Sequence, residues 1–383
     1  MQKKNHQVTQ DQTSFLERVK IVVVKIGTRV LTARDGTVDV NRISHLIDQV
    51  QLLFKKEVKV VLVTSGAITA GTVEMGLQDR PKTLPEQQAA AAVGQSVLME
   101  LYHNQFKNKG MMVAQVLVTA DDLKDRKRHL NARNTLLSLI NRGIIPIINE
   151  NDTVSVDEIK FGDNDRLSAL VCNLVRAELL IMLSDIDGLM TSDPRKGKES
   201  QLINRVDEIT PEIEKIAGRS SSFCGTGGMS TKLDAAKIAV RSGVSVIICN
   251  GMKDNSITDI FLGKKRGTLF LAKKSTLTAK KRWIAFFVKP KGELIVDEGA
   301  RDALRDRGRS LLSSGITQIK GTFEIGDTVR ILDIGGTEFA RGLVNYSSTD
   351  VHKIRGIKTS EIETVLGYKF YDEVIHRDNL VLL

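Results

Sequence analysis

The stretch Lys-Ile-Val-Val-Val-Lys-Ile-Gly-Thr, residues 20–28, decides how the fold of this 383-residue chain is interpreted. Its apolar residues are mostly β-branched and have few polar breaks, which predicts a strand buried on both faces. Five later runs have the same character, at residues 58–63, 112–118, 144–148, 179–183 and 244–249. Strands buried on both faces are typical of parallel sheets, so we expect such a sheet here.

Segments with the helical spacing of apolar residues lie between most of these strands. They cover residues 43–54, 86–106, 122–141, 165–175 and 231–242. This alternation predicts an α/β fold, in which a mostly parallel sheet is sandwiched by helices. In sheets of this kind ligands bind beyond the carboxyl ends of the strands.

The alternating pattern stops near residue 250. Residues 251–282 lose helical spacing, and beyond them the chain is β-rich, with a hairpin expected around the glycines at 335–336 after a short helix at 299–307. We place a domain boundary close to residue 280. The expected parts are a disordered tail over 1–17, an α/β domain over 18–275 and a small β-rich domain over 283–383.

The net charge of +10 is concentrated in one short stretch. Residues 251–282 carry nine basic and two acidic side chains, whereas residues 283–383 carry 14 and 15. A broad basic face is therefore absent, and we do not expect nucleic acid as a partner.

Other sequence features favour a cytoplasmic protein. No apolar run is long enough to span a membrane, and the polar first fifteen residues do not form a secretory signal. The three cysteines are isolated, without a CxxC pair, so neither a zinc site nor a disulfide framework is expected. A reducing compartment fits this cysteine usage.

Residues 225–232, Gly-Thr-Gly-Gly-Met-Ser-Thr-Lys, are the most informative motif for function. A glycine loop that leads into a helix, here with Ser230 as the expected N-cap, directs unpaired N–H groups and a partial positive charge at one point. Lys232 adds a full charge, so the motif predicts an anion site, most often for phosphate. The alternative for a lone glycine cluster is a flexible loop before a surface helix.

Five further polar clusters follow strands or open helices of the first domain. Each one taken alone has an ordinary interpretation as a turn or a helix cap, Asp165 included. The carboxylates would repel each other unless a cation or an ammonium group lies between them. Together they supply charge, close backbone approach and hydrogen bonds where this fold binds its ligand, which suits phosphoryl transfer. The clusters are Lys25 with Gly27-Thr28, and residues 64–67, 149–152, 162–165 and 184–185.

Taken in order, residues 24–28, 64–67, 149–152, 162–165 and 225–232 resemble the motifs of the amino-acid kinase family, in the branch that phosphorylates glutamate. Residues 296–300 and the hairpin at 326–346 resemble the PUA domain that many of these kinases carry. The resemblance spans roughly residues 20–383. It implies an amino-acid kinase fold followed by a PUA-like domain.

The resemblance also implies roles for individual residues. Lys25 and Lys232 would be catalytic, with Asp163 and Asp165 orienting these lysines or Mg²⁺, and no residue is assigned as a metal ligand. Relatives commonly have Thr-Asp where this chain has Ser184-Asp185, so the hydroxyl is kept. Glutamate would be bound by Ser65, Asn149, Asp152 and Asn164. ATP would be bound by Lys25, Ser184, Asp185, Thr226, Gly227, Gly228, Met229, Ser230, Thr231 and Lys232.

The reaction implied is transfer of the γ-phosphoryl group of ATP to the side-chain carboxylate of L-glutamate, with Mg²⁺. Its products are L-glutamyl 5-phosphate and ADP, in the first step of proline biosynthesis. The resemblance further implies feedback inhibition by proline, a homo-oligomer and transfer of the product to glutamyl phosphate reductase.

Two alternatives stay open. A sister kinase acting on aspartate, acetylglutamate, carbamate or a nucleotide would use the same sheet, and PUA-like domains elsewhere bind RNA. A Walker-type NTPase is excluded because GxxxxGK[ST] is absent, and a dinucleotide dehydrogenase is not expected because the turn after the first strand lacks GxGxxG.

Overall fold

The computed structural model describes residues 15–33, 35–154, 164–192, 200–218, 228–272 and 279–383. The chain divides into two compact units, Met1–Ser275 and Thr276–Leu383, and each is described by itself.

The first unit is built on an eight-stranded sheet in the order β3-β4-β2-β1-β5-β7-β8-β6. The six strands from β3 to β7 pair in parallel, as the buried apolar runs predict, whereas β8 pairs antiparallel with β7 and β6 pairs parallel with β8. Their bounds are β1 Ile21–Ile26, β2 Lys59–Val63, β3 Val113–Val118, β4 Ile145–Glu150, β5 Leu179–Ser184, β6 Arg205–Val206, β7 Ser245–Asn250 and β8 Thr268–Phe270.

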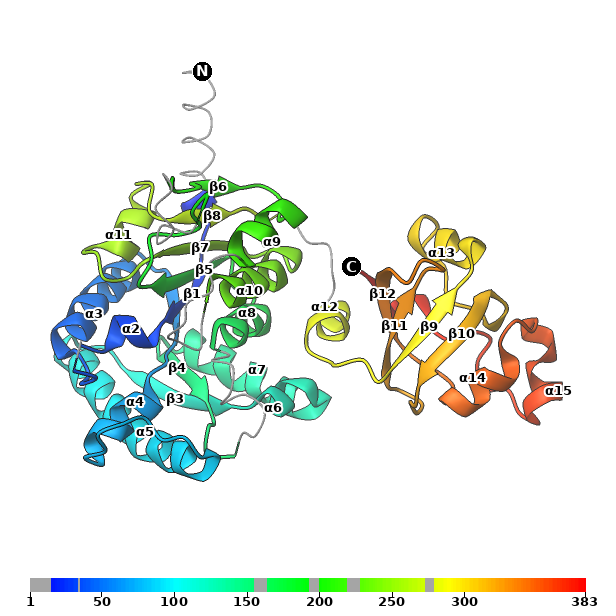
Figure 1. Cartoon of the computed structure of the whole chain (residues 1–383), viewed down its shortest axis with the longest axis horizontal. Helices are drawn as coiled ribbons and strands as arrows, with labels where there is room; N and C mark the ends of the chain where they lie inside the picture. Colours follow the sequence, from blue (N-terminus) through cyan, green and yellow to red (C-terminus); the bar gives the residue numbers. More distant parts are fainter. Residues whose placement is uncertain (1–14, 34, 155–163, 193–199, 219–227, 273–278) are drawn as a thin grey trace, which may run out of the picture. The chain divides into compact units, whose positions relative to one another are not determined.

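Helices cover both faces of this sheet (Figure 1). One layer contains α3 (Val40–Lys55), α5 (Leu84–Asn108) and α11 (Ser256–Phe261). The other contains α7 (Arg126–Asn141), α8 (Asn164–Val175) and α10 (Met229–Arg241), with α9 (Pro211–Gly218) packed on α10. The shorter helices are α2 Thr28–Leu31, α4 Ala67–Glu74 and α6 Ala120–Lys124.

Successive side chains of β1 point to opposite faces of the sheet. Val22, Val24 and Ile26 are buried in the core with the apolar face of α3. The Lys25 side chain points to the opposite face, which α8 covers, as its contact with Asp165 in that helix shows. The single polar residue in this part of β1 is therefore buried beneath a helix.

Two expectations about the helices are wrong. The segment 122–141 is divided into α6 and α7, because Asp125 has an extended backbone and caps α7 by accepting from Arg128 N at 2.8 Å. Helical structure also continues beyond residue 250, as α11 and as α12 (Ala279–Phe286). Helices of six and eight residues are too short for their periodicity to stand out in the sequence.

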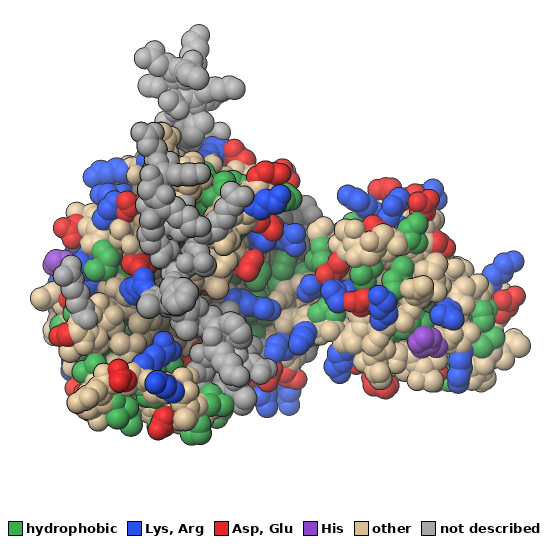
Figure 2. Space-filling model, in the orientation of Figure 1, with side chains coloured by type: hydrophobic (Ala, Val, Ile, Leu, Met, Phe, Trp, Pro, Cys, Tyr) green, Lys and Arg blue, Asp and Glu red, His purple; other side chains and the backbone are tan. Residues whose placement is uncertain are grey.

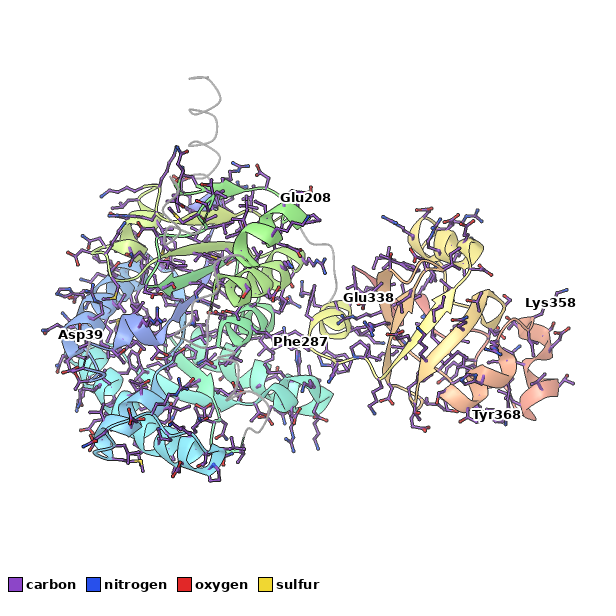
Figure 3. The ribbon with its side chains drawn as sticks, viewed as in Figure 1. Asp39, Glu208, Phe287, Glu338, Lys358 and Tyr368 are labelled. Carbon is purple, nitrogen blue, oxygen red and sulfur yellow. The ribbon has the colours of Figure 1, made fainter. Side chains whose placement is uncertain are left out.

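The second unit has a five-stranded sheet in the order β10-β9-β11-β12-β13. The hairpin expected at 326–346 is confirmed, since β11 and β12 pair antiparallel around Gly336, whose φ of +80° suits glycine. Tyr368, labelled in Figure 3, follows α15, and its hydroxyl donates to Asp350 Oδ2 in α14 at 2.7 Å. The elements are β9 Gly292–Val296, β10 Ile316–Gly321, β11 Thr328–Leu332, β12 Glu338–Leu343, β13 Leu380–Leu382, α13 Glu298–Arg305, α14 Ser348–Ile354 and α15 Ile362–Leu366, with α12 against β12 and β13.

A close crossing of α4 and α5 holds the loop that follows β2. A Cβ atom added at Gly94 would lie 1.8 Å from Ala67 O and 2.3 Å from Gly71 N. Only glycine permits this approach, which fixes α5 against the first turn of α4. The loop before α4 therefore has a defined position relative to α5.

Replacement of Gly94 by Ala should destabilise the first unit by about 3 kcal/mol, although Ala normally stabilises a helix by about 1 kcal/mol over Gly. Urea unfolding followed by circular dichroism measures the difference. Gly218→Ala at the end of α9 in the same unit is the control, because its new Cβ would meet no atom within 4 Å. Equal unfolding midpoints for the two variants would contradict the close crossing.

Candidate functional site

The candidate site lies at the carboxyl ends of the parallel strands. Lys25 is the next-to-last residue of β1, Ser65 follows β2, Asn149 is the next-to-last residue of β4, and Ser184 ends β5. Because these strands run in the same direction, their carboxyl ends share one edge of the sheet. The first turns of α8 and α10 lie at the same edge, since they contribute residues that contact these side chains.

A buried trio of two lysines and one aspartate forms the charged half of the site. Lys25 Nζ lies 2.8 Å from Asp165 Oδ1, and Lys232 Nζ lies 3.3 Å from Asp165 Oδ2. The exposed fractions of the three residues are 6%, 5% and 1% for Lys25, Lys232 and Asp165. The Thr231 hydroxyl adds a contact of 2.9 Å to Asp165 Oδ2. One carboxylate balances two ammonium groups, so this trio retains a positive charge that an anion would neutralise.

The electrostatics of Asp165 follow from this geometry. Burial by itself raises the pKa of its carboxyl group, but the charges of Lys25 and Lys232 lower that pKa to about 2. Burial lowers the pKa of Lys232, and the charge of Lys25 acts in the same direction, while Asp165 opposes both. Asp165 is therefore ionised at neutral pH and is not merely the helix N-cap that its position allows.

The start of α10 differs from the expectation. Gly228, not Ser230, is the N-cap, without a side-chain hydrogen bond, and α10 begins at Met229. Ser230 is exposed within the first turn, while Lys232 is buried one position beyond Thr231. Glycine is among the residues favoured at an N-cap, and here it occupies that position without a side-chain hydrogen bond.

An amide cluster forms the uncharged half of the site. Asn164 Nδ2 lies 2.8 Å from Thr64 O, 2.9 Å from Asn149 Oδ1 and 3.0 Å from Ser65 Oγ. The structure thus brings together three of the four residues expected to bind the substrate. Asp152 lies in the turn after β4 with its side chain partly buried.

At the end of β5, Ser184 Oγ lies 3.1 Å from Asp185 Oδ1. Arg29 in α2 donates to Asp185 Oδ2 at 2.6 Å. Burial raises the pKa of Asp185, but the Arg29 hydrogen bond and charge hold it below its usual value. Asp163, Thr226 and Gly227 lie outside the described residues.

Sequence reasoning missed three residues that hold this site: Arg29, Gln95 and Tyr102. The Gln95 Oε1 atom accepts from Asn149 Nδ2 at 2.8 Å, and the Tyr102 hydroxyl lies 2.9 Å from Thr64 Oγ1. Both residues are on one face of α5, seven positions apart, with buried Leu98 between them. A polar side chain within this apolar face was the signal available in the sequence.

The charged trio does not supply a metal site. Both oxygens of Asp165 are engaged by Lys25, Lys232 and Thr231. Among the residues that the structure describes, no group of three or more His, Cys, Asp and Glu side chains is placed to hold a metal ion.

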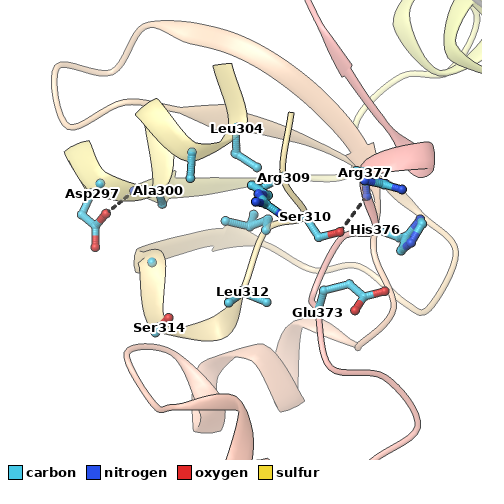
Figure 4. Close-up of a pocket in the computed structure, with 14 residues that line it drawn as sticks. Asp297, Ala300, Leu304, Arg309, Ser310, Leu312, Ser314, Glu373, His376 and Arg377 are labelled. Atoms are coloured by element: carbon cyan, nitrogen blue, oxygen red, sulfur yellow. Dashed lines mark hydrogen bonds between the residues drawn. The ribbon is translucent and has the colours of Figure 1, made fainter. Parts of the chain in front are cut away.

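The second unit contains a separate pocket of about 820 Å³ beside α13 (Figure 4). Arg309, His376 and Arg377 line it together with the carboxylates Asp297 and Glu373. On the face shown in Figure 2, basic and acidic side chains are interspersed over this unit. The mixed charges match the balance counted in the sequence.

Comparison with known proteins places the chain in a family. Residues 20–250 match the model of the amino acid kinase family, and residues 292–366 match that of the PUA domain. The chain belongs to the amino acid kinase family.

Its relatives are similar over nearly the whole length. The glutamate 5-kinase of Geobacter sp. (strain M21) is 54% identical over 96% of this chain and 99% of that protein. The glutamate 5-kinase of Thermoanaerobacter sp. (strain X514) is 51% identical over 94% and 97%. A solved structure of carbamate kinase from Giardia lamblia bound to AMP-PNP has a TM-score of 0.49 at 16% identity, and covers 67% of this chain and 100% of that one.

Within the described ranges, none of the helices is both long enough and apolar enough to cross a membrane.

Replacement of Asp165 by Asn should lower the free energy of unfolding by about 3–5 kcal/mol, because it leaves two buried lysines without their carboxylate. The pKa of Asp165 is lowered from 3.8 to about 2, so its contribution is complete above pH 5 and is lost as the pH falls through about 2. The difference between wild type and variant should shrink between pH 4 and pH 2.

Chemical denaturation over this pH range measures that difference. Asp254→Asn is the control, because the Asp254 side chain is 82% exposed and lies 3.9 Å from Arg42. A stability difference for Asp165→Asn no larger than that of the control would contradict the assigned ion pairs.

Proposed function

We propose that this protein is an ATP-dependent kinase that transfers the γ-phosphoryl group to the side-chain carboxylate of L-glutamate. The observation that carries the proposal is the buried Lys25–Asp165–Lys232 trio beside the amide cluster of Asn164. A charged half suits phosphates and an uncharged half suits a small polar acid. Relatives named glutamate 5-kinase, about half identical over nearly the whole chain, support glutamate as the acceptor.

The proposed chemistry needs positioning and charge more than proton transfer. A glutamate side chain has a pKa of about 4.3 and is already a nucleophilic carboxylate at neutral pH. Its oxygen attacks the γ-phosphorus of ATP, the bond to the bridging oxygen breaks, and ADP leaves. No general base is required, so the main contribution of the protein is to stabilise the negative charge of the transferring group.

Lys25 and Lys232 supply that stabilisation in our proposal. Both ammonium groups are held by Asp165 before substrate arrives, so they need little reorganisation during the reaction. Asp165 acts through the lysines as a positioning residue. Asp163 lies outside the described residues, and its part in this arrangement stays a prediction.

The remaining site residues divide between the two substrates. Ser65, Asn149, Asp152 and Asn164 would bind glutamate. Ser184 and Asp185, together with residues 226–231 at the start of α10, would bind the nucleotide. We propose that Mg²⁺ arrives bound to the ATP phosphates, because in kinase sites Mg²⁺ is held mainly by substrate phosphates and water with one or two carboxylates.

We further propose a cytoplasmic homo-oligomer that proline inhibits and that serves proline biosynthesis. An acyl phosphate is labile in water, which favours direct transfer of the product to glutamyl phosphate reductase. These features are what the resemblance of the sequence motifs to the amino-acid kinase family implies, and the geometry of the site does not bear on them. The mixed charge of the second unit does not favour nucleic acid as a partner.

An ATP-consumption assay with a panel of acids tests the proposed reaction. L-Glutamate should be phosphorylated in preference to L-aspartate, N-acetylglutamate, carbamate and UMP, and proline should reduce the rate. Preference for another acceptor would overturn the glutamate assignment while leaving the family assignment intact.

Lys232→Ala should lower kcat by about 10²- to 10³-fold while changing the KM for glutamate less than about threefold, because the lost charge acts mainly in the transition state. Steady-state kinetics measure both parameters. Lys237→Ala on the same helix, which removes surface contacts with Glu214 and Asp234, is the matched control. Near-normal turnover of Lys232→Ala would rule out the assigned role.

A further inference from the structure

The amide cluster has a fixed hydrogen-bond direction, because backbone groups anchor it. The Glu150 N–H can only donate, and it lies 2.9 Å from the Asn149 Oδ1 atom, which must therefore be the oxygen of that amide. At the other end, Thr64 O can only accept, and it lies 2.8 Å from Asn164 Nδ2. Neither amide can be reversed without losing a bond to the backbone.

This direction determines how Gln95 is oriented. With its oxygen occupied, Asn149 must donate through Nδ2, so Gln95 must present Oε1 to it, at 2.8 Å. The result is a chain of three amides, Gln95, Asn149 and Asn164, in which each oxygen accepts from the next nitrogen. We call these three residues the amide chain.

The amide chain ends in an unused acceptor. All the contacts of the Asn164 amide run through Nδ2, and in the part of the chain that the structure describes, the buried Oδ1 has no hydrogen-bond partner. A buried acceptor without a partner costs free energy, so a ligand donor is expected there. L-Glutamate has one donor group at neutral pH, its α-ammonium.

We propose that Gln95 is a positioning residue that makes the site select an amino acid over a plain dicarboxylic acid. By accepting from Asn149 Nδ2, it completes the amide chain, whose direction the backbone contacts set, and holds Asn164 Oδ1 in place for the substrate ammonium group. This inference rests on the proposed function, because it takes the acceptor to be an amino acid.

The position of Gln95 is itself fixed by packing. Its neighbour Gly94 is held against Ala67 at the start of α4, and Tyr102 on the same helix contacts Thr64. Burial raises the pKa of Tyr102 to about 12, so its hydroxyl keeps its proton. Helix α5 is thus attached to the substrate side of the site at two points, one turn on either side of Leu98.

Without the Gln95 acceptor, Asn149 Nδ2 loses its partner in the amide chain, and the position of Asn149, and with it that of Asn164 Oδ1, is less tightly held. A displaced Asn164 Oδ1 would accept less well from the substrate ammonium group, and that hydrogen bond would weaken. A substrate that lacks the ammonium group would not experience this change. Glutarate, which is glutamate without its amino group, therefore separates the proposed role from a general defect.

The test compares kcat/KM for L-glutamate with that for glutarate in Gln95→Met, which keeps the length of the side chain and removes its amide. We expect about a tenfold loss for L-glutamate and a change below about twofold for glutarate, since a hydrogen bond to a charged group is affected only in the first. Where glutarate turns over too slowly, its Ki against L-glutamate replaces kcat/KM.

Gln87→Met is the matched control, because Gln87 lies on the same helix and donates to Pro81 O at 2.8 Å, away from the amide chain. It should leave both acids unchanged. Should Gln95→Met not fold, Gln95→Asn withdraws the acceptor by one methylene group and carries the same expectation. Equal losses for both acids, or no loss for L-glutamate, would overturn the proposal.

The outcome for the wild type keeps the two proposals separate. Absence of glutamate phosphorylation by the wild type would overturn the proposed function, whatever the variants do. The comparison is then made with the amino acid that the wild type does phosphorylate and the same acid without its amino group. If the wild type phosphorylates glutamate and the Gln95→Met variant behaves like the wild type, only the inference on Gln95 is overturned.

Discussion

The sharing of one buried carboxylate by two lysines is the interaction on which the rest of this structure depends. Lys25 belongs to a central strand and Lys232 to a helix much later in the chain, and burial of either ammonium alone would be costly. Asp165 offsets that cost only if the first turns of α8 and α10 converge over the end of β1. The parallel sheet makes this convergence possible because its strands end at one edge.

Helix α8 also joins the two halves of the site. Its consecutive residues Asn164 and Asp165 point in directions that differ by about 100°, since an α-helix has 3.6 residues per turn. Asp165 therefore serves the charged trio while Asn164 serves the amide cluster. The distance between the charged trio and the amide cluster is set by one step of backbone, which in the proposed function would align the two substrates rigidly.

The order of the strands and helices, and most of the residues at the strand ends, could be predicted from the sequence. These features depend on local properties, such as the runs of β-branched residues in β1 and the glycines before α10. The errors were local as well. Asp125 ends one helix and caps the next, and Gly228 takes the cap position expected for Ser230, because alternative caps compete within a few residues.

The sequence by itself determined the class of fold and the kinds of chemical group available for phosphates and for a polar acid. Only the tertiary structure decided how those groups are paired: Asp165 with two lysines, Asn164 with Asn149, and Gln95 with Asn149. The reason is that these bonds join elements far apart in the chain. Their partners are selected by sheet order and by the close crossing of α4 and α5, and neither leaves a periodic signal in the residues themselves.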